Sequence, residues 1–185
     1  MFSQNCTCDP DHIDCELINN SDLDGSINND SYGNCTVNCW NASHGTPHII
    51  TMNSSTGVCT GSNPMTCLKA FGDSDCITSY PGEGIFTFVN LVPSSDVTYI
   101  LSIRARLANC VGDHNPENTR LRVALCNGLQ NYDNMDFNNV DNCLPDIPTT
   151  TVLDVNPPFN SFQTFGTQIT PTEVFSQVLV YPYYI

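Results

Sequence analysis

Short runs of alternating apolar and polar residues recur along this chain, and no window of about eleven residues has a helical period. The clearest run is Tyr99–Leu107, in which Ser102, Arg104 and Arg106 lie on the face opposite to the apolar residues. A second run, Arg120–Cys126, repeats the pattern. Clusters of Asn, Gly, Ser, Asp and Pro separate such runs and are typical of turns. The sequence therefore predicts an all-β chain folded as an antiparallel β-sandwich.

The expected strands are the segments between these turn clusters. They cover residues 17–23, 35–40, 48–52, 65–71, 84–91, 97–108, 120–126, 149–155, 161–168 and 173–181. Residues 1–16 have no such period and are rich in Cys and Asp, so we expect an N-terminal leader 1–16 followed by one domain, 17–185. A chain of 185 residues fits a single domain with a substantial core.

The chain has 11 cysteines, a density typical of proteins whose thiols pair in an oxidising compartment. We therefore expect a disulfide-stapled domain that is secreted or displayed at the cell surface. A disulfide between Cys126 and Cys143 would close a loop and add about 3 kcal/mol of stability. The odd count leaves one thiol over, which is free or forms a bridge to a missing segment or, by self-association, to another subunit. A zinc site is the alternative for the leader, with ligands Cys6, Cys8, His12 and Cys15.

Charge and motifs exclude several classes of function. The formal net charge of −14 leaves no source for phosphate neutralisation, so nucleic acid is excluded as a partner. No apolar run approaches the roughly 20 residues of a membrane helix, so we expect no membrane insertion. The nucleophile-elbow and zinc-protease motifs are missing, and we expect that the protein is not an enzyme. Glycoside hydrolysis by two carboxylates stays open, because such residues need only meet in space.

Four of the five basic residues form two Arg-x-Arg pairs, Arg104 with Arg106 and Arg120 with Arg122. Alternate residues of a strand share a face, so each pair should project from one side of a sheet. The connection 108–119 is rich in turn residues, and we expect the two strands to form a hairpin with all four guanidinium groups on one patch. Two interpretations stand: the patch pairs with the chain's own carboxylates, or it binds the carboxylate or sulfate groups of an acidic polysaccharide.

Three segments carry a resemblance to a known family. Leu17–Gly25 is similar to an opening strand of the form L-V-P-N-G-D-F-E, and Trp40–His48 is similar to a Trp followed by Gly-Thr-Pro-Asp. Tyr99–Arg106 and the closing segment Ile169–Pro182 resemble later strands. In this order they resemble jelly-roll modules of Bacteroidota surface proteins, which are similar to carbohydrate-binding modules of the CBM4/9/22 type. The resemblance implies a jelly roll that binds polysaccharide or cell-surface glycan without catalysis, or serves in adhesion.

The same resemblance implies a structural Ca²⁺ held by an acidic residue after the opening strand. Asp24 stands at this position, where the family has Glu, and His48 stands where the family often has Asp. Imidazole at position 48 weakens an acidic site, because Ca²⁺ takes oxygen ligands. The loop 127–142 is a second calcium candidate, whose alternative is an ordinary solvated loop. Its carboxylates are Asp133, Asp136 and Asp141.

Three aromatic residues are candidates for ligand stacking, because the C–H edge of a sugar packs on an aromatic ring. Trp40 is the sole tryptophan, and its alternative is a place in the core. Tyr80 and Tyr132 lie in expected loops. The rival to a binding module is a structural subunit of an extracellular filament or surface layer, in which the unpaired cysteine and the strand-rich ends join neighbouring subunits.

Overall fold

The computed structural model describes residues 40–44, 48–52, 63–68, 83–95, 97–107, 118–129, 146–159 and 161–185. All regular secondary-structure elements of these described residues are β-strands. The strands are β1 (Trp40–His44), β2 (His48–Met52), β3 (Asn63–Cys67), β4 (Gly84–Leu91), β5 (Tyr99–Ala105), β6 (Thr119–Cys126), β7 (Thr149–Val155), β8 (Gln163–Ile169) and β9 (Phe175–Tyr184). The all-β prediction is confirmed, and most expected strands coincide with observed ones.

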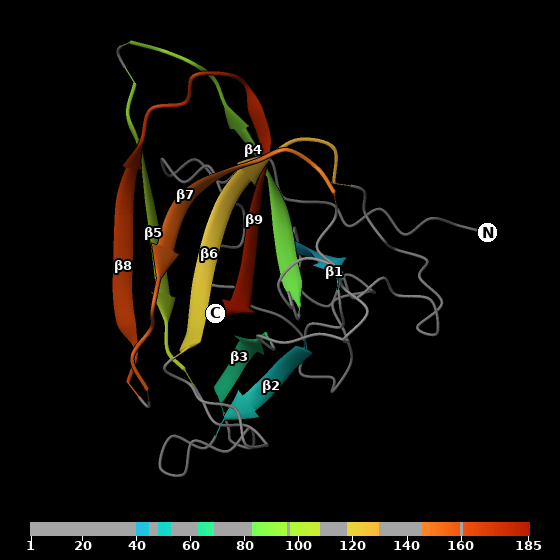
Figure 1. Ribbon diagram of the computed structural model, residues 1–185, viewed down its shortest axis with the longest axis vertical. Helices are drawn as coiled ribbons and strands as arrows, with labels where there is room; N and C mark the ends of the chain where they lie inside the picture. The colour runs from blue at the N-terminus through green and yellow to red at the C-terminus, as the bar shows by residue number, and fades with distance from the viewer. Residues whose placement is uncertain are drawn as a thin grey trace, which may run out of the picture.

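Five strands form the larger sheet, in the order β1-β4-β9-β6-β7. Strands β5 and β8 form a separate two-stranded ribbon, and so do β2 and β3. All of these pairings are antiparallel. Figure 1 shows the β5–β8 ribbon lying beside β6 and β7, with β9 on the far side of β6.

The main core lies between the larger sheet and the β5–β8 ribbon. Leu121, Val123 and Leu125 project from one face of β6 into this core. Leu101 of β5 and Ile169 of β8 belong to the same buried cluster. Since fully burying one such side chain is worth about 1.5–3 kcal/mol, the alternation of apolar residues in these strands holds the two layers together. The arrangement is a β-sandwich of two antiparallel layers.

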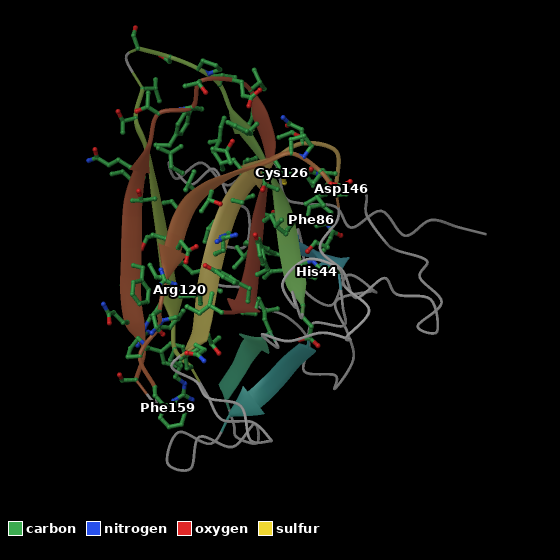
Figure 2. All side chains as sticks on the ribbon, viewed as in Figure 1. His44, Phe86, Arg120, Cys126, Asp146 and Phe159 are labelled. Atoms are coloured by element: carbon green, nitrogen blue, oxygen red, sulfur yellow. The ribbon has the colours of Figure 1, made fainter. Side chains whose placement is uncertain are left out.

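The larger sheet also buries apolar residues on its other face. Phe86, Cys126, Leu129, Leu179 and Tyr181 form a second buried cluster there. Figure 2 labels Phe86 and Cys126, which come from different strands of this sheet. The alternation in β6 predicted only one apolar face for this strand. Because of this second cluster, a side chain of the larger sheet that points away from the main core can still be buried.

The predicted hairpin between the two arginine-bearing strands is wrong. β5 pairs with β8, from Tyr99 opposite Ile169 to Ala105 opposite Gln163. β6 lies instead between β7 and β9. The hairpin was inferred from closeness in the chain, but two strands that each have one apolar face can also bury these faces against each other. The chain therefore changes layer between Leu107 and Asn118.

Cys126 at the end of β6 is a free, buried thiol, so the disulfide to Cys143 considered above does not form in this structure. Burial raises the pKa of the Cys126 thiol to about 11, which leaves it protonated and unreactive near neutral pH. The side chains of the other ten cysteines lie outside the described residues. The disulfides expected among them, the zinc alternative and the leader 1–16 stay predictions.

Replacing Gly84 by Ala should destabilise the fold. A Cβ atom at this position would lie 2.3 Å from His44 Cε1 and 2.5 Å from Ser43 Oγ, both of buried residues. Overpacking of a buried site costs about 1–3 kcal/mol, measurable as the free energy of unfolding in denaturant. The matched control is Gly166→Ala, because a Cβ there would meet only the Leu101 carbonyl oxygen, at 3.3 Å. Equal losses in the two variants would contradict this interpretation of the packing.

Candidate functional site

The two arginine pairs project from opposite outer faces of the sandwich. Arg104 lies on the side of β5 that faces away from the main core, and Arg106, directly after the strand, lies over the same Phe162 ring as Arg104. Arg120 and Arg122 lie on the corresponding outer side of β6. The prediction of one patch with four arginines is therefore wrong. Both pairs nevertheless lie toward the same end of the molecule, because β5 ends where β6 begins (Figure 1).

The register of β6 brings Arg120 and Arg122 to an aspartate and two tyrosines. Arg122 lies opposite Asp154 of β7 on one side and opposite Tyr181 of β9 on the other. Arg120 lies opposite Tyr183. Directly opposed residues of antiparallel strands share a face, so these five side chains gather on the outer face of the larger sheet. We call them the Asp154 network.

Asp154 accepts hydrogen bonds from three side chains of this network. Its Oδ1 accepts from Arg120 Nε at 2.9 Å, and its Oδ2 accepts from Arg122 Nη2 at 2.7 Å and from Arg122 Nε at 3.1 Å. The Tyr183 hydroxyl donates to Oδ2 at 2.7 Å. The Arg122 guanidinium also lies 4.3 Å from the centre of the Tyr183 ring, which is within cation–π range.

The network shifts the pKa values of its members. Burial alone would raise the pKa of Asp154, but hydrogen bonds from Arg122, Tyr183 and Arg120 outweigh it and lower the pKa. For Arg122, burial lowers the pKa, while hydrogen bonds to Asp154 and Tyr181 leave it raised overall. The pKa of Tyr183 is raised by burial and by its bond to Asp154. Internal pairing is therefore the correct interpretation for Arg122, whose charge is held by Asp154.

The row of residues across the sheet continues from Arg122 to a buried histidine. Tyr181 accepts a hydrogen bond from Arg122 Nη1 at 3.3 Å and meets the His44 ring edge-on, with 6.0 Å between ring centres. His44 lies opposite Gly84, whose missing side chain leaves room for the imidazole. Its Nδ1 is 2.9 Å from Ser43 Oγ. This buried row fixes the position of Tyr181 and, through it, of Arg122.

Arg104 and Arg106 have different surroundings from Arg120 and Arg122. Both guanidinium groups lie over the ring of Phe162, at 5.0 Å for Arg104 and 4.8 Å for Arg106. Phe162 directly precedes β8 and is 41% exposed. Arg104 is exposed too, and no carboxylate of the described residues forms an ion pair with it. Arg104 is thus a cation that is positioned by an aromatic ring and open to solvent.

Neutral residues surround Arg104 on the outer face of the β5–β8 ribbon. Arg104 lies opposite Thr164, Ser102 opposite Gly166, and Ile100 opposite Gln168. All six are exposed. We call this surface the ribbon face; it consists of Ile100, Ser102, Arg104, Phe162, Thr164, Gly166 and Gln168. Gly166 adds no side chain at its centre, so hydroxyl, amide and guanidinium groups are all reachable from solvent there.

Of the three aromatic candidates, only Trp40 lies among the described residues. Trp40 is only 6% exposed and lies in the main core, so its predicted role as a stacking surface for a ligand is wrong. Tyr80 and Tyr132 lie outside the described residues. Sequence reasoning missed Phe162, although an aromatic residue in a segment of Pro, Asn and Ser next to a strand is a usable signal. It also missed Asp154, whose role depends on a register that the sequence does not specify.

The calcium candidates are not tested by the described residues. Asp24, Asp133, Asp136 and Asp141 all lie outside them. In the part of the chain that is described, no group of His, Cys, Asp or Glu has the arrangement of a metal site. Nor does any helix there have the length and apolar character needed to cross a membrane.

No protein-family model matches this chain, and neither a curated protein nor a solved structure does. The resemblance to jelly-roll carbohydrate-binding modules therefore stays a prediction.

Replacing Asp154 by Asn should weaken the fold and change its response to acid. Asn keeps one acceptor oxygen but loses the negative charge and the second acceptor, so Arg122 is left partly buried without its counter-ion, at a cost of about 1–3 kcal/mol. Because the pKa of Asp154 is lowered on folding, its contribution is complete above the unfolded pKa of about 4 and is lost as the pH falls below it.

The measurement is the free energy of unfolding between about pH 2 and pH 7 for the wild type and Asp154→Asn. The difference between them should shrink toward the acid end. Asp146→Asn, which removes an exposed carboxylate outside the strands, is the matched control. A constant difference across this range would show that the Asp154 charge contributes nothing to folding.

Proposed function

We propose that this protein is a secreted or surface-displayed carbohydrate-binding module without catalytic activity, and that it binds acidic polysaccharide on the ribbon face. The observation that carries the proposal is Arg104. In a chain with 19 acidic and 5 basic residues, this exposed guanidinium has an aromatic partner, Phe162, but forms no ion pair with the described carboxylates. An oxyanion of a ligand is the partner that its chemistry favours.

Phe162 acts in this proposal as a positioning residue. A cation–π contact at an exposed site is worth about 0.5–1 kcal/mol. That is enough to restrict the rotamers of a long side chain before a ligand arrives, which lowers the entropic cost of binding. Arg106 lies over the same ring at 4.8 Å and completes the stack.

The neutral residues of the ribbon face suit a sugar chain. Ser102 and Thr164 can donate to and accept from sugar hydroxyl groups, and Gln168 offers both an amide N–H and a carbonyl oxygen. The antiparallel register spaces these groups along the ribbon on both sides of Gly166. A polymer with neutral hydroxyls and a carboxylate or sulfate on some residues matches this combination better than a small inorganic anion does.

The rival proposal is a filament subunit joined through the unpaired cysteine. Cys126 is buried and its thiol stays protonated, so it is not suited to bridge two subunits. Any such bridge would have to involve a cysteine outside the described residues. Among the described residues, the exposed cation on the ribbon face favours ligand binding over assembly.

Binding to polygalacturonate, dextran sulfate and neutral dextran tests the proposal, by affinity electrophoresis or calorimetry. Arg104→Gln should weaken binding to an acidic polymer by about 10- to 100-fold, since a charge-assisted hydrogen bond is worth about 1.5–3 kcal/mol. Its melting temperature should change little because Arg104 is exposed. Phe162→Leu should give a smaller loss in the same direction.

Lys69→Gln is the matched control, since it removes the same charge at the chain's single lysine. It should bind acidic polymers nearly as well as the wild type. Equal weakening by Lys69→Gln and Arg104→Gln would reduce the effect to net charge. Failure of the wild type to bind any of the three polymers would refute the proposed function.

A further inference from the structure

Two guanidinium groups share one carboxylate in the Asp154 network. Arg120 and Arg122 each bring one positive charge, and Asp154 brings one negative charge. No second carboxylate of the described residues forms an ion pair with either arginine. Tyr183 stays protonated at neutral pH because its pKa is raised. The network therefore has a net charge of plus one, on a protein whose formal net charge is −14.

The unused hydrogen-bond donors are concentrated on Arg120. A guanidinium has five N–H donors. Arg122 makes four hydrogen bonds, two to Asp154 and one each to Tyr181 and Tyr183. With the described residues as partners, Arg120 makes only two, from Nε to Asp154 Oδ1 and from Nη2 to the Asp154 carbonyl oxygen. Three of its N–H groups have no acceptor among the described residues, and the side chain is 33% exposed.

Asp154 holds the Nε/Nη2 edge of the Arg120 guanidinium through its carboxylate and its backbone carbonyl oxygen, which leaves the Nη1/Nη2 edge for another partner. A guanidinium that is fixed at one edge and open at the other offers parallel N–H groups to a planar or tetrahedral oxyanion. Fixing the side chain in advance removes much of the entropic cost of binding. Figure 2 labels Arg120 at the lower half of β6, near β7.

We propose that Arg120, held by Asp154 and adjacent to Tyr183, forms a second oxyanion site, which binds a carboxylate or sulfate group of an acidic polysaccharide. The choice of a polysaccharide rests on the proposed function, whereas the oxyanion site does not. The ribbon face and the Arg120 site lie on opposite outer faces of the sandwich. A single module then engages two polysaccharide chains and bridges them.

The four arginines allow a direct test, because the Nε–H region of a ¹H–¹⁵N spectrum holds one signal for each. Single Arg→Lys variants assign these signals. Titration of the wild-type protein with sodium galacturonate and, separately, with sodium sulfate at constant ionic strength should shift the signals of Arg104 and Arg120. The Arg122 signal should move less, since four of its donors are already used. Sodium chloride is the control titrant.

Each outcome is informative. Shifts at Arg104 alone would overturn the second site and leave the proposed function intact. Shifts at Arg120 alone would support the second site and refute the ribbon face as the binding surface. Equal shifts in chloride, or no shift at either arginine, would overturn both. A response to only one of the two anions would identify the ligand group as carboxylate or as sulfate.

Agglutination of polysaccharide-coated beads measures bridging separately from binding. Wild-type protein should agglutinate beads coated with polygalacturonate or with dextran sulfate, whichever group the titration identifies. Arg104→Gln and Arg120→Gln should each stop agglutination while retaining weaker binding to the beads, because one site is left. Arg120→Gln keeps the Arg122–Asp154 pair, and its melting curve checks that it folds. Unchanged agglutination by folded Arg120→Gln would contradict the bridging role.

Discussion

The packing of β6 against the β5–β8 ribbon is the interaction on which the rest of the structure depends. Leu121, Val123 and Leu125 point into the core from one side, and Leu101 and Ile169 meet them from the other. Because side chains of a strand alternate, this burial forces every second residue of β5 and β6 to the outside of the sandwich. The positions of all four arginines follow from it, and so does their separation into two layers.

The separation gives chemically similar pairs different roles. On the larger sheet, the register places Asp154 and two tyrosines beside Arg120 and Arg122, and Asp154 neutralises one charge of the pair. On the ribbon, Phe162 stacks with Arg104 and provides no charge. Arg120 and Arg122 share one carboxylate, and Arg104 stacks on an exposed ring. Both arrangements leave positive charge accessible on an acidic protein. This combination is what links the fold to oxyanion binding.

The sequence predicts the local features of this fold well and the long-range ones poorly. Alternation in Tyr99–Ala105 and Thr119–Cys126 is a local pattern, and it correctly assigns core and outer residues of β5 and most of β6. Strand pairing depends on partners far along the chain, such as β8 for β5 and β9 for β6. Nothing in either strand specifies these partners, so closeness in sequence gave the wrong hairpin. The error carried over to the four-arginine patch.

The candidate site residues show the same difference between local features, which the sequence predicts, and long-range contacts, which it does not. Arg104 could be predicted as an outward residue from its strand alone, but its stacking on Phe162 needs β5 and β8 to be adjacent. Trp40 illustrates the opposite error, since it was a candidate for ligand stacking, whereas its large apolar surface is buried in the core. Residue type predicts what a side chain can do, and only the packing decides whether it is accessible.

A double-mutant cycle on folding stability tests the central claim, that the two arginine pairs lie in separate layers and only one of them is bound to Asp154. The first cycle compares Arg122→Gln, Asp154→Asn and the variant that carries both changes. The second cycle compares Arg104→Gln, Asp154→Asn and their combination. The structure predicts a coupling free energy of about 1–3 kcal/mol between Arg122 and Asp154 and none between Arg104 and Asp154. Equal coupling of both arginines to Asp154, or no coupling for Arg122, would contradict it.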